Sequence, residues 1–112
     1  MGKSQRDKGK NYELEVAELL RTFGWSMAKR SGHRQAQIGD GSPDVDGLHG
    51  YFIECKRYAS IGRVYKWLQQ AIDTCQDGRV PVVFMRGDRE ESLVVIRATD
   101  FLEIVTKEWE RE

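Results

Sequence analysis

The sequence predicts a mixed α/β or α+β domain in which helices pack on a β-sheet. Three segments repeat apolar residues at helical spacing, and five short apolar segments between them are typical of strands. The polar stretches that separate these segments are too short to be domain linkers, and 112 residues fit one domain. We therefore expect a single sheet flanked by helices, in the order α-β-β-β-α-β-β-α.

The first part of the chain is predicted to hold one long helix. Residues 1–8 are expected to form a loose basic arm, and residues 9–23 a helix that ends at Gly24, because glycine readily closes a last helical turn. Residues 25–29 can form a short strand, and residues 31–42 are predicted to form a polar, glycine-rich loop. The helix is indicated by apolar residues at one helical face, namely Tyr12, Val16, Leu19, Leu20 and Phe23.

The remaining elements are a hairpin, a helix, two strands and a last helix. Thr99 is predicted to cap that last helix, because a threonine oxygen can accept from a free amide of the first turn. The apolar stripe expected on it comprises Phe101, Leu102, Ile104, Val105 and Trp109. The hairpin is expected at 43–47 and 51–56, the middle helix at 63–77, and the two strands at 80–85 and 93–96.

Composition excludes several protein classes. The chain is 39% hydrophobic and 32% charged with 2 prolines, which excludes collagen and low-complexity disorder. Cys55 and Cys75 show no CxxC or metal-ligand spacing, so a reduced compartment is expected. The start of the chain is not typical of a signal peptide, and no apolar stretch approaches the roughly 20 residues of a membrane span. We predict a cytoplasmic protein without a membrane partner.

The hairpin carries the charged residues that suggest chemistry. Glu54 and Lys56 lie two apart on a strand, so their side chains leave the same face. Asp44 lies on the preceding strand, and the pairing register decides whether it joins them. Asp, Glu and Lys on one strand face usually form a solvated ion-pair cluster, but this strand is otherwise apolar, where charges are costly.

Turn chemistry favours one register. A two-residue loop would place Asp44 opposite Ile53, on the wrong face for a shared site. A three-residue loop, residues 48–50, places Asp44 opposite Glu54 and Val45 opposite Ile53. Three-residue hairpin loops prefer glycine in third place, where Gly50 stands. We therefore expect two carboxylates close together on one face.

Such a pair of carboxylates suits a divalent cation. Two acids a few ångström apart repel each other unless a cation lies between them, and oxygen donors with open water positions favour Mg²⁺, for which Mn²⁺ can substitute. The backbone carbonyl of Cys55 is a plausible third donor to Asp44 and Glu54. Lys56 can orient an attacking water or stabilise charge on a phosphate. Together these groups suit metal-assisted hydrolysis of a phosphodiester, without a small-molecule cofactor.

The same residues carry a family resemblance. Pro43-Asp44, a spacer of nine residues and Glu54-Cys55-Lys56 resemble the signature of PD-(D/E)xK nucleases. Lys8-Gly9-Lys10-Asn11-Tyr12-Glu13-Leu14-Glu15, which opens the first helix, resembles the entry helix of archaeal-type and phage Holliday junction resolvases, and Arg30-Ser31-Gly32 is similar to that family too. The resemblance covers residues 8–105 and is looser after Arg57.

The resemblance implies a restriction-endonuclease-like mixed sheet flanked by helices, with residues 9–112 as one nuclease domain. It also implies a homodimer, dependence on Mg²⁺ and cleavage of branched double-stranded DNA at four-way junctions. It assigns Asp44 and Glu54 as metal ligands, Lys56 as catalytic and Glu13 as an acid of the same site. On a helical wheel, Glu13 lies near the apolar face of its helix, from which it can reach the sheet.

Basic residues gather in the first third of the chain, since residues 1–34 hold eight basic against four acidic residues although the net charge is zero. Clustered cations can meet DNA phosphates. The residues expected to contact DNA are Lys8, Lys10, Arg30, Ser31, His33, Arg34 and Arg57.

Other functions stay open on the sequence alone. Another PD-(D/E)xK nuclease, with nicking, repair or restriction-like activity, would use the same residues. A DNA-binding module without chemistry would use the acids as ion-pair partners. A structural domain is a weaker alternative, since it would have no need of charges on an apolar strand.

Overall fold

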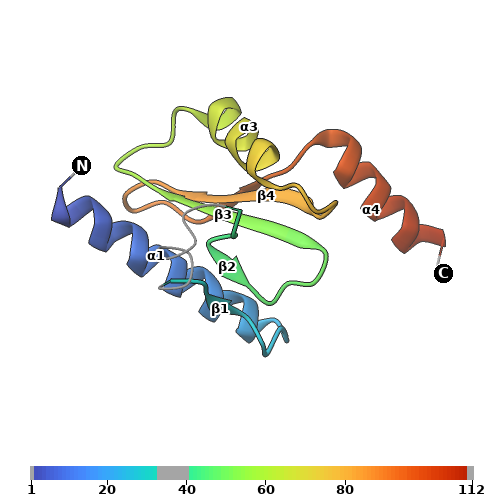
Figure 1. Cartoon of the computed structure of the whole chain (residues 1–112), viewed down its shortest axis with the longest axis horizontal. Coiled ribbons are helices and arrows are strands. Elements are labelled where there is room, and N and C mark those ends of the chain that lie inside the picture. Colours follow the sequence, from blue (N-terminus) through green and yellow to red (C-terminus); the bar gives the residue numbers. More distant parts are fainter. Residues whose placement is uncertain (1, 33–40, 111–112) are drawn as a thin grey trace.

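The computed structural model describes residues 2–32 and 41–110, with side chains through Glu108. A five-stranded mixed sheet in the order β1-β2-β3-β4-β5 lies between α1 on one face and α3 on the other (Figure 1). The predicted α+β class and element order are confirmed. The elements are α1 (Lys3–Thr22), β1 (Lys29–Arg30), β2 (Val45–Asp46), β3 (Tyr51–Arg57), α3 (Val64–Thr74), β4 (Val80–Arg86), β5 (Leu93–Val95) and α4 (Ala98–Glu110).

The sheet is mixed because of one crossover. β1, β2 and β3 pair antiparallel, as do β4 and β5, whereas β3 and β4 pair parallel along their whole length. A parallel pair cannot be closed by a hairpin, and α3 provides the crossover between these two strands. The arrangement is consistent with the restriction-endonuclease-like fold expected from the resemblance.

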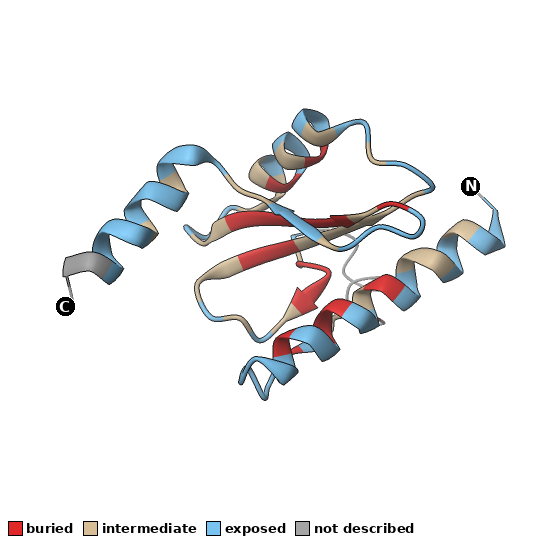
Figure 2. Ribbon diagram, turned by 180° about the vertical axis from the view of Figure 1, so that it is seen from behind, coloured by how far each residue is buried: buried red, intermediate tan, exposed pale blue. Residues whose placement is uncertain are grey.

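The two faces of the sheet hold separate apolar layers. Val82 and Phe84 of β4 pack toward α1, whereas Val83 and Met85 pack toward Trp67 of α3. This alternation follows from the two-residue period of a strand. The buried stretches of the central strands and the inner side of α1 form the interior (Figure 2). None of the helices in the described part of the chain has both the length and the apolar character that crossing a bilayer requires.

The predicted N-terminal arm is wrong. α1 begins at Lys3, so most of residues 1–8 are helical instead of loose. Contacts distant in sequence explain this: Gln5 Nε2 donates to the Arg57 carbonyl at 2.7 Å, and Lys8 Nζ lies 3.4 Å from Asp88 Oδ1. The expected end of the helix is confirmed, because α1 ends at Thr22 and Gly24 has φ +103°.

Two further boundaries differ from expectation. The strand expected over 25–29 is reduced to Lys29–Arg30, and α3 ends at Thr74, before the predicted residue 77. The expected loop 31–42 falls largely outside the described residues.

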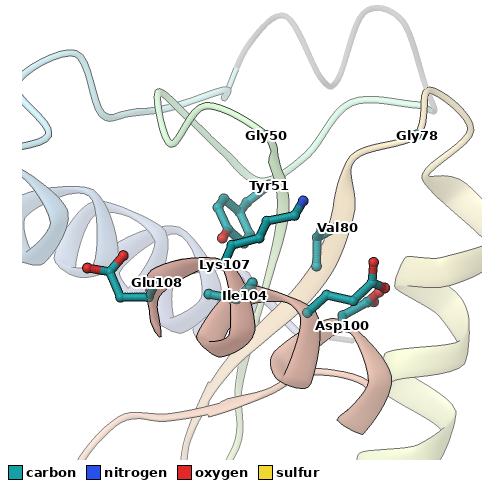
Figure 3. Close-up of a pocket in the computed structure, with 9 residues that line it drawn as sticks. Gly50, Tyr51, Gly78, Val80, Asp100, Ile104, Lys107 and Glu108 are labelled. Atoms are coloured by element: carbon teal, nitrogen blue, oxygen red, sulfur yellow. The ribbon is translucent and has the colours of Figure 1, made fainter. Parts of the chain in front are cut away.

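The last helix departs most from the prediction. It begins at Ala98, so Thr99 lies inside it and cannot be its cap. Three residues of the apolar stripe are not core, since Phe101, Leu102 and Val105 are 52%, 56% and 39% exposed. Ile104 is half-buried, and the side chain of Trp109 lies outside the described ones. A pocket of about 590 Å³ opens between α4 and the first residues of β3 and β4 (Figure 3).

The close approach of β2 to the segment before β1 gives a stability prediction. Gly47 and Gly50 both have positive φ, +105° and +91°. A Cβ added at Gly47 would lie 2.5 Å from Ala28 Cα, whereas one added at Gly50 would meet nothing within 4 Å. Gly50→Ala should therefore lose only the conformational cost of about 1–2 kcal/mol, and Gly47→Ala about 2–5 kcal/mol. Urea denaturation of both variants checks this, and equal losses would contradict it.

Candidate active site

The hairpin holds Asp44 in a buried position next to β3. β2 and β3 pair with Val45 opposite Ile53, which confirms the predicted register. The Asp44 amide donates to the Ile53 carbonyl at 2.8 Å, and its carboxylate oxygen Oδ2 accepts from the Cys55 amide, also at 2.8 Å. Asp44 is only 8% exposed. Its carboxylate is therefore fixed by the backbone of the strand that carries Glu54.

Lys56 contacts α3. Its Nζ donates to Gln70 Oε1 at 3.0 Å, a contact across 14 residues of sequence. The side chain of Gln70 thus lies toward the site, although polar residues on an exposed helix face usually point to water. The sequence allows Gln70 to face the site or the solvent. The packing of α3 on the sheet determines which of the two occurs.

Glu13 reaches the same region from α1. Its side chain is 14% exposed, and its Oε1 accepts from Arg30 Nε at 2.7 Å. The prediction that Glu13 lies toward the sheet is confirmed. Arg30, expected to contact DNA, is here the ion-pair partner of Glu13 and neutralises part of the acidic cluster.

Asp44 acts electrostatically on both glutamates. Burial, reinforced by the Asp44 carboxylate, raises the pKa of Glu54 to about 8, and Lys56 opposes the shift. Burial and Asp44 also raise the pKa of Glu13 to about 7, against the effect of Arg30. The effect of Asp44 on both glutamates indicates that the three carboxyl groups lie within electrostatic range of one another.

The donors present are those of a hard divalent cation. No group of three or more His, Cys, Asp or Glu side chains within residues 2–32 and 41–108 forms a ready-made metal cage. The buried Asp44 and the half-buried Glu54 carboxylates nevertheless gain from a cation between them. Burial raises the pKa of the Cys55 thiol, so the carbonyl of Cys55, and not a thiolate, is its available donor. Asp44, Glu54 and this carbonyl could hold the ion, with Glu13 beside them.

A basic groove adjoins the acids. A pocket of about 320 Å³ lies between the first half of α1 and the end of β3, so that Glu13 and Lys56 share its wall with several cations. Such a surface attracts an anionic ligand to the acidic cluster. The lining residues are Gln5, Arg6, Gly9, Lys10, Glu13, Arg30, Cys55, Lys56, Arg57 and Tyr58.

The other residues expected to contact DNA have different surroundings. Lys8 and Arg57 both pair with Asp88, at 3.4 and 2.7 Å. Ser31 Oγ donates to Asp46 Oδ2 at 3.1 Å. Lys10 lines the groove. His33 and Arg34 lie outside the described residues. Sequence reasoning missed Asp88 and Gln5, because only the folded chain brings them to the end of β3.

The raised pKa values give a pH dependence of stability without divalent cations. The ordinary pKa of glutamate is 4.5, against about 7 for Glu13 and about 8 for Glu54 in the folded chain. The folded state therefore holds protons that the unfolded chain releases, and stability should fall as the pH rises from about 4.5 to about 8. Thermal unfolding in EDTA checks this. Glu54→Gln should flatten the slope, and an unchanged slope in that variant would contradict the assignment.

Comparisons with known proteins agree with the geometry. The chain matches, over residues 4–111, the family described as "Phage putative PDDEXK endonuclease". No curated protein and no solved structure matches it. The match covers nearly the whole chain, including α1, the hairpin and the Glu54-Cys55-Lys56 segment. The chain therefore belongs to this phage endonuclease family of the PD-(D/E)xK superfamily.

Proposed function

We propose that this endonuclease cleaves four-way DNA junctions and depends on Mg²⁺. The observation that carries the proposal is the electrostatic effect of Asp44 on both Glu54 and Glu13, next to a basic groove whose wall includes Glu13 and Lys56. The family supports a nuclease. The junction as substrate is supported by the likeness of residues 8–15 and 30–32 to Holliday junction resolvases.

The residues of the chain have distinct roles in the proposed reaction. Asp44 and Glu54, with the Cys55 carbonyl, would hold the ion. Bound there, Mg²⁺ would supply Lewis acidity toward the scissile phosphodiester. Lys56, steadied by Gln70 at 3.0 Å, places a positive charge where the phosphate gains negative charge.

The groove cations would orient the DNA backbone. Arg6 and Lys10 of α1 and Arg57 of β3 line one continuous pocket with Lys56. Contacts to phosphate fix the position of the backbone but carry no sequence information. This groove therefore favours recognition of DNA shape over recognition of sequence.

Resolution of a junction needs two cuts related by a two-fold axis. One chain carries one such acidic cluster among its described residues. A C₂ dimer would supply the second site in the symmetric position. We propose that the active species is this homodimer.

Substitution of the site residues should separate binding from cleavage. Asp44→Asn keeps the shape of the side chain and removes its charge, and Lys56→Ala removes the cation. Each should lower the cleavage rate about 100-fold or more while junction binding persists. Lys66→Ala, a change of an exposed lysine on α3, is the control and should retain activity. Cleavage by both site variants at the control's rate would contradict the assigned roles.

A comparison of substrates tests the proposed function itself. A synthetic four-way junction should be cut faster than a linear duplex of the same sequence, in paired positions, and only with Mg²⁺ or Mn²⁺. Gel analysis over a metal titration, with EDTA as control, measures both. Equal cutting of the duplex would indicate another PD-(D/E)xK nuclease. Binding without cutting at any metal concentration would indicate a DNA-binding module.

A further inference from the structure

We propose that Asp88 masks a phosphate-binding subsite formed by Arg57 and Lys8 at the end of the groove, and that a DNA phosphate displaces its carboxylate. The inference rests on the proposed function, because it assumes that DNA follows this groove. Asp88 lies in the loop between β4 and β5. The acids and the lysine of the candidate active site come from other segments of the chain.

Asp88 makes two ion pairs with cations from different elements. Its Oδ1 accepts from Arg57 Nη1 of β3 at 2.7 Å, and Lys8 Nζ of α1 lies 3.4 Å from the same oxygen. One carboxylate oxygen thus takes the place between two cations that a phosphate oxygen would take. Their charge lowers the pKa of Asp88, with Arg57 as the main cause.

Arg57 connects this subsite to the groove. Arg57 lines the same pocket as Lys56 and Lys10, and its side chain is 12% exposed. Asp88 is more open, with 48% of its side chain exposed. The carboxylate can therefore turn away into solvent while the arginine stays in place. A ligand that approaches along the groove meets Arg57 next to Lys56.

The ion pairs are not needed to hold the loop. The Asp88 amide donates to the Ala59 carbonyl at 3.0 Å, and the Glu90 amide donates to the Gly87 carbonyl at 3.3 Å. Gly87 is buried, and a Cβ there would lie 3.3 Å from the Ala59 carbonyl oxygen. These backbone hydrogen bonds, with Arg86 Nη1 donating to the Glu90 carbonyl at 3.4 Å, hold the turn without the Asp88 carboxylate, and ion pairs that are open to solvent on one side usually stabilise a fold little. The role of the Asp88 side chain is therefore better explained by the two cations it pairs with than by the stability of the loop.

A mask of this kind weakens DNA binding in a measurable way. Each phosphate contact changes the slope of log K against log salt by about −0.9, because it releases counterions. A phosphate that must displace Asp88 gains less from Arg57 and Lys8 than it would from free cations. Removal of the carboxylate should therefore raise affinity and increase the salt dependence of binding.

The experiment compares Asp88→Asn with the wild type and with Glu91→Gln. Glu91 gives the matched control, because it carries the same charge in the same loop but forms no ion pair within the described residues. Binding to labelled linear duplex is followed by fluorescence anisotropy in EDTA, between about 50 and 200 mM salt. Asp88→Asn should bind about three- to tenfold tighter at low salt, with a slope steeper by about 1–2. Glu91→Gln should change affinity by less than about twofold.

A double-mutant cycle separates the mask from a general charge effect. Arg57→Gln should weaken binding, and the gain from Asp88→Asn should disappear in its presence. Asp88→Ser repeats the measurement with a second side chain, and thermal unfolding shows that both variants fold. Affinity no higher than that of Glu91→Gln, while the wild type still cuts junctions, would overturn the mask alone. A wild type that binds no DNA would overturn the mask and the proposed function together.

Discussion

The site depends on holding carboxyl groups close to one another where solvent has little access to them. Asp44 and Glu54 occupy opposite positions of the hairpin because the turn that contains Gly50 sets the register of β2 and β3. Glu13 of α1 acts on the same region. Left alone, these groups would repel, and burial makes the repulsion stronger. The fold holds them by the pairing of β2 with β3, by the Cys55 amide that donates to the Asp44 carboxylate and by the ion pair of Glu13 with Arg30.

The central strand makes this possible. β3 is bonded to β2 on one side and to β4 on the other, and Ile53 is fully buried beside the acids. Such a strand cannot shift by one residue without exposing its apolar face. The packing of the apolar residues of β3 therefore offsets the unfavourable repulsion among the acids. The Cys55 amide adds a direct constraint, since its bond to Asp44 Oδ2 orients that carboxylate.

Much of this arrangement could be predicted from local patterns, and the failures share one cause. The hairpin register followed from turn chemistry, and the position of Glu13 followed from helical spacing. The start of α1 and the contacts of Gln70 and Asp88 depend on residues 14 to 80 positions away, which no local pattern reports. For α4, an amphipathic pattern predicted a helix correctly but not what its apolar face would cover.

The two arginines next to the candidate active site share one feature. Arg30 pairs with Glu13 at 2.7 Å, and Arg57 pairs with Asp88 at 2.7 Å, so two arginines that line the groove are each matched by one acid. Lys56 is different, because its described partner is the neutral amide of Gln70. Lys56 acts on Glu54 electrostatically but forms no ion pair within the described residues, whereas the arginines must exchange a carboxylate for a phosphate. These pairs hold the arginines in place for an anionic substrate, but a phosphate that must displace a carboxylate gains less than it would from a free cation.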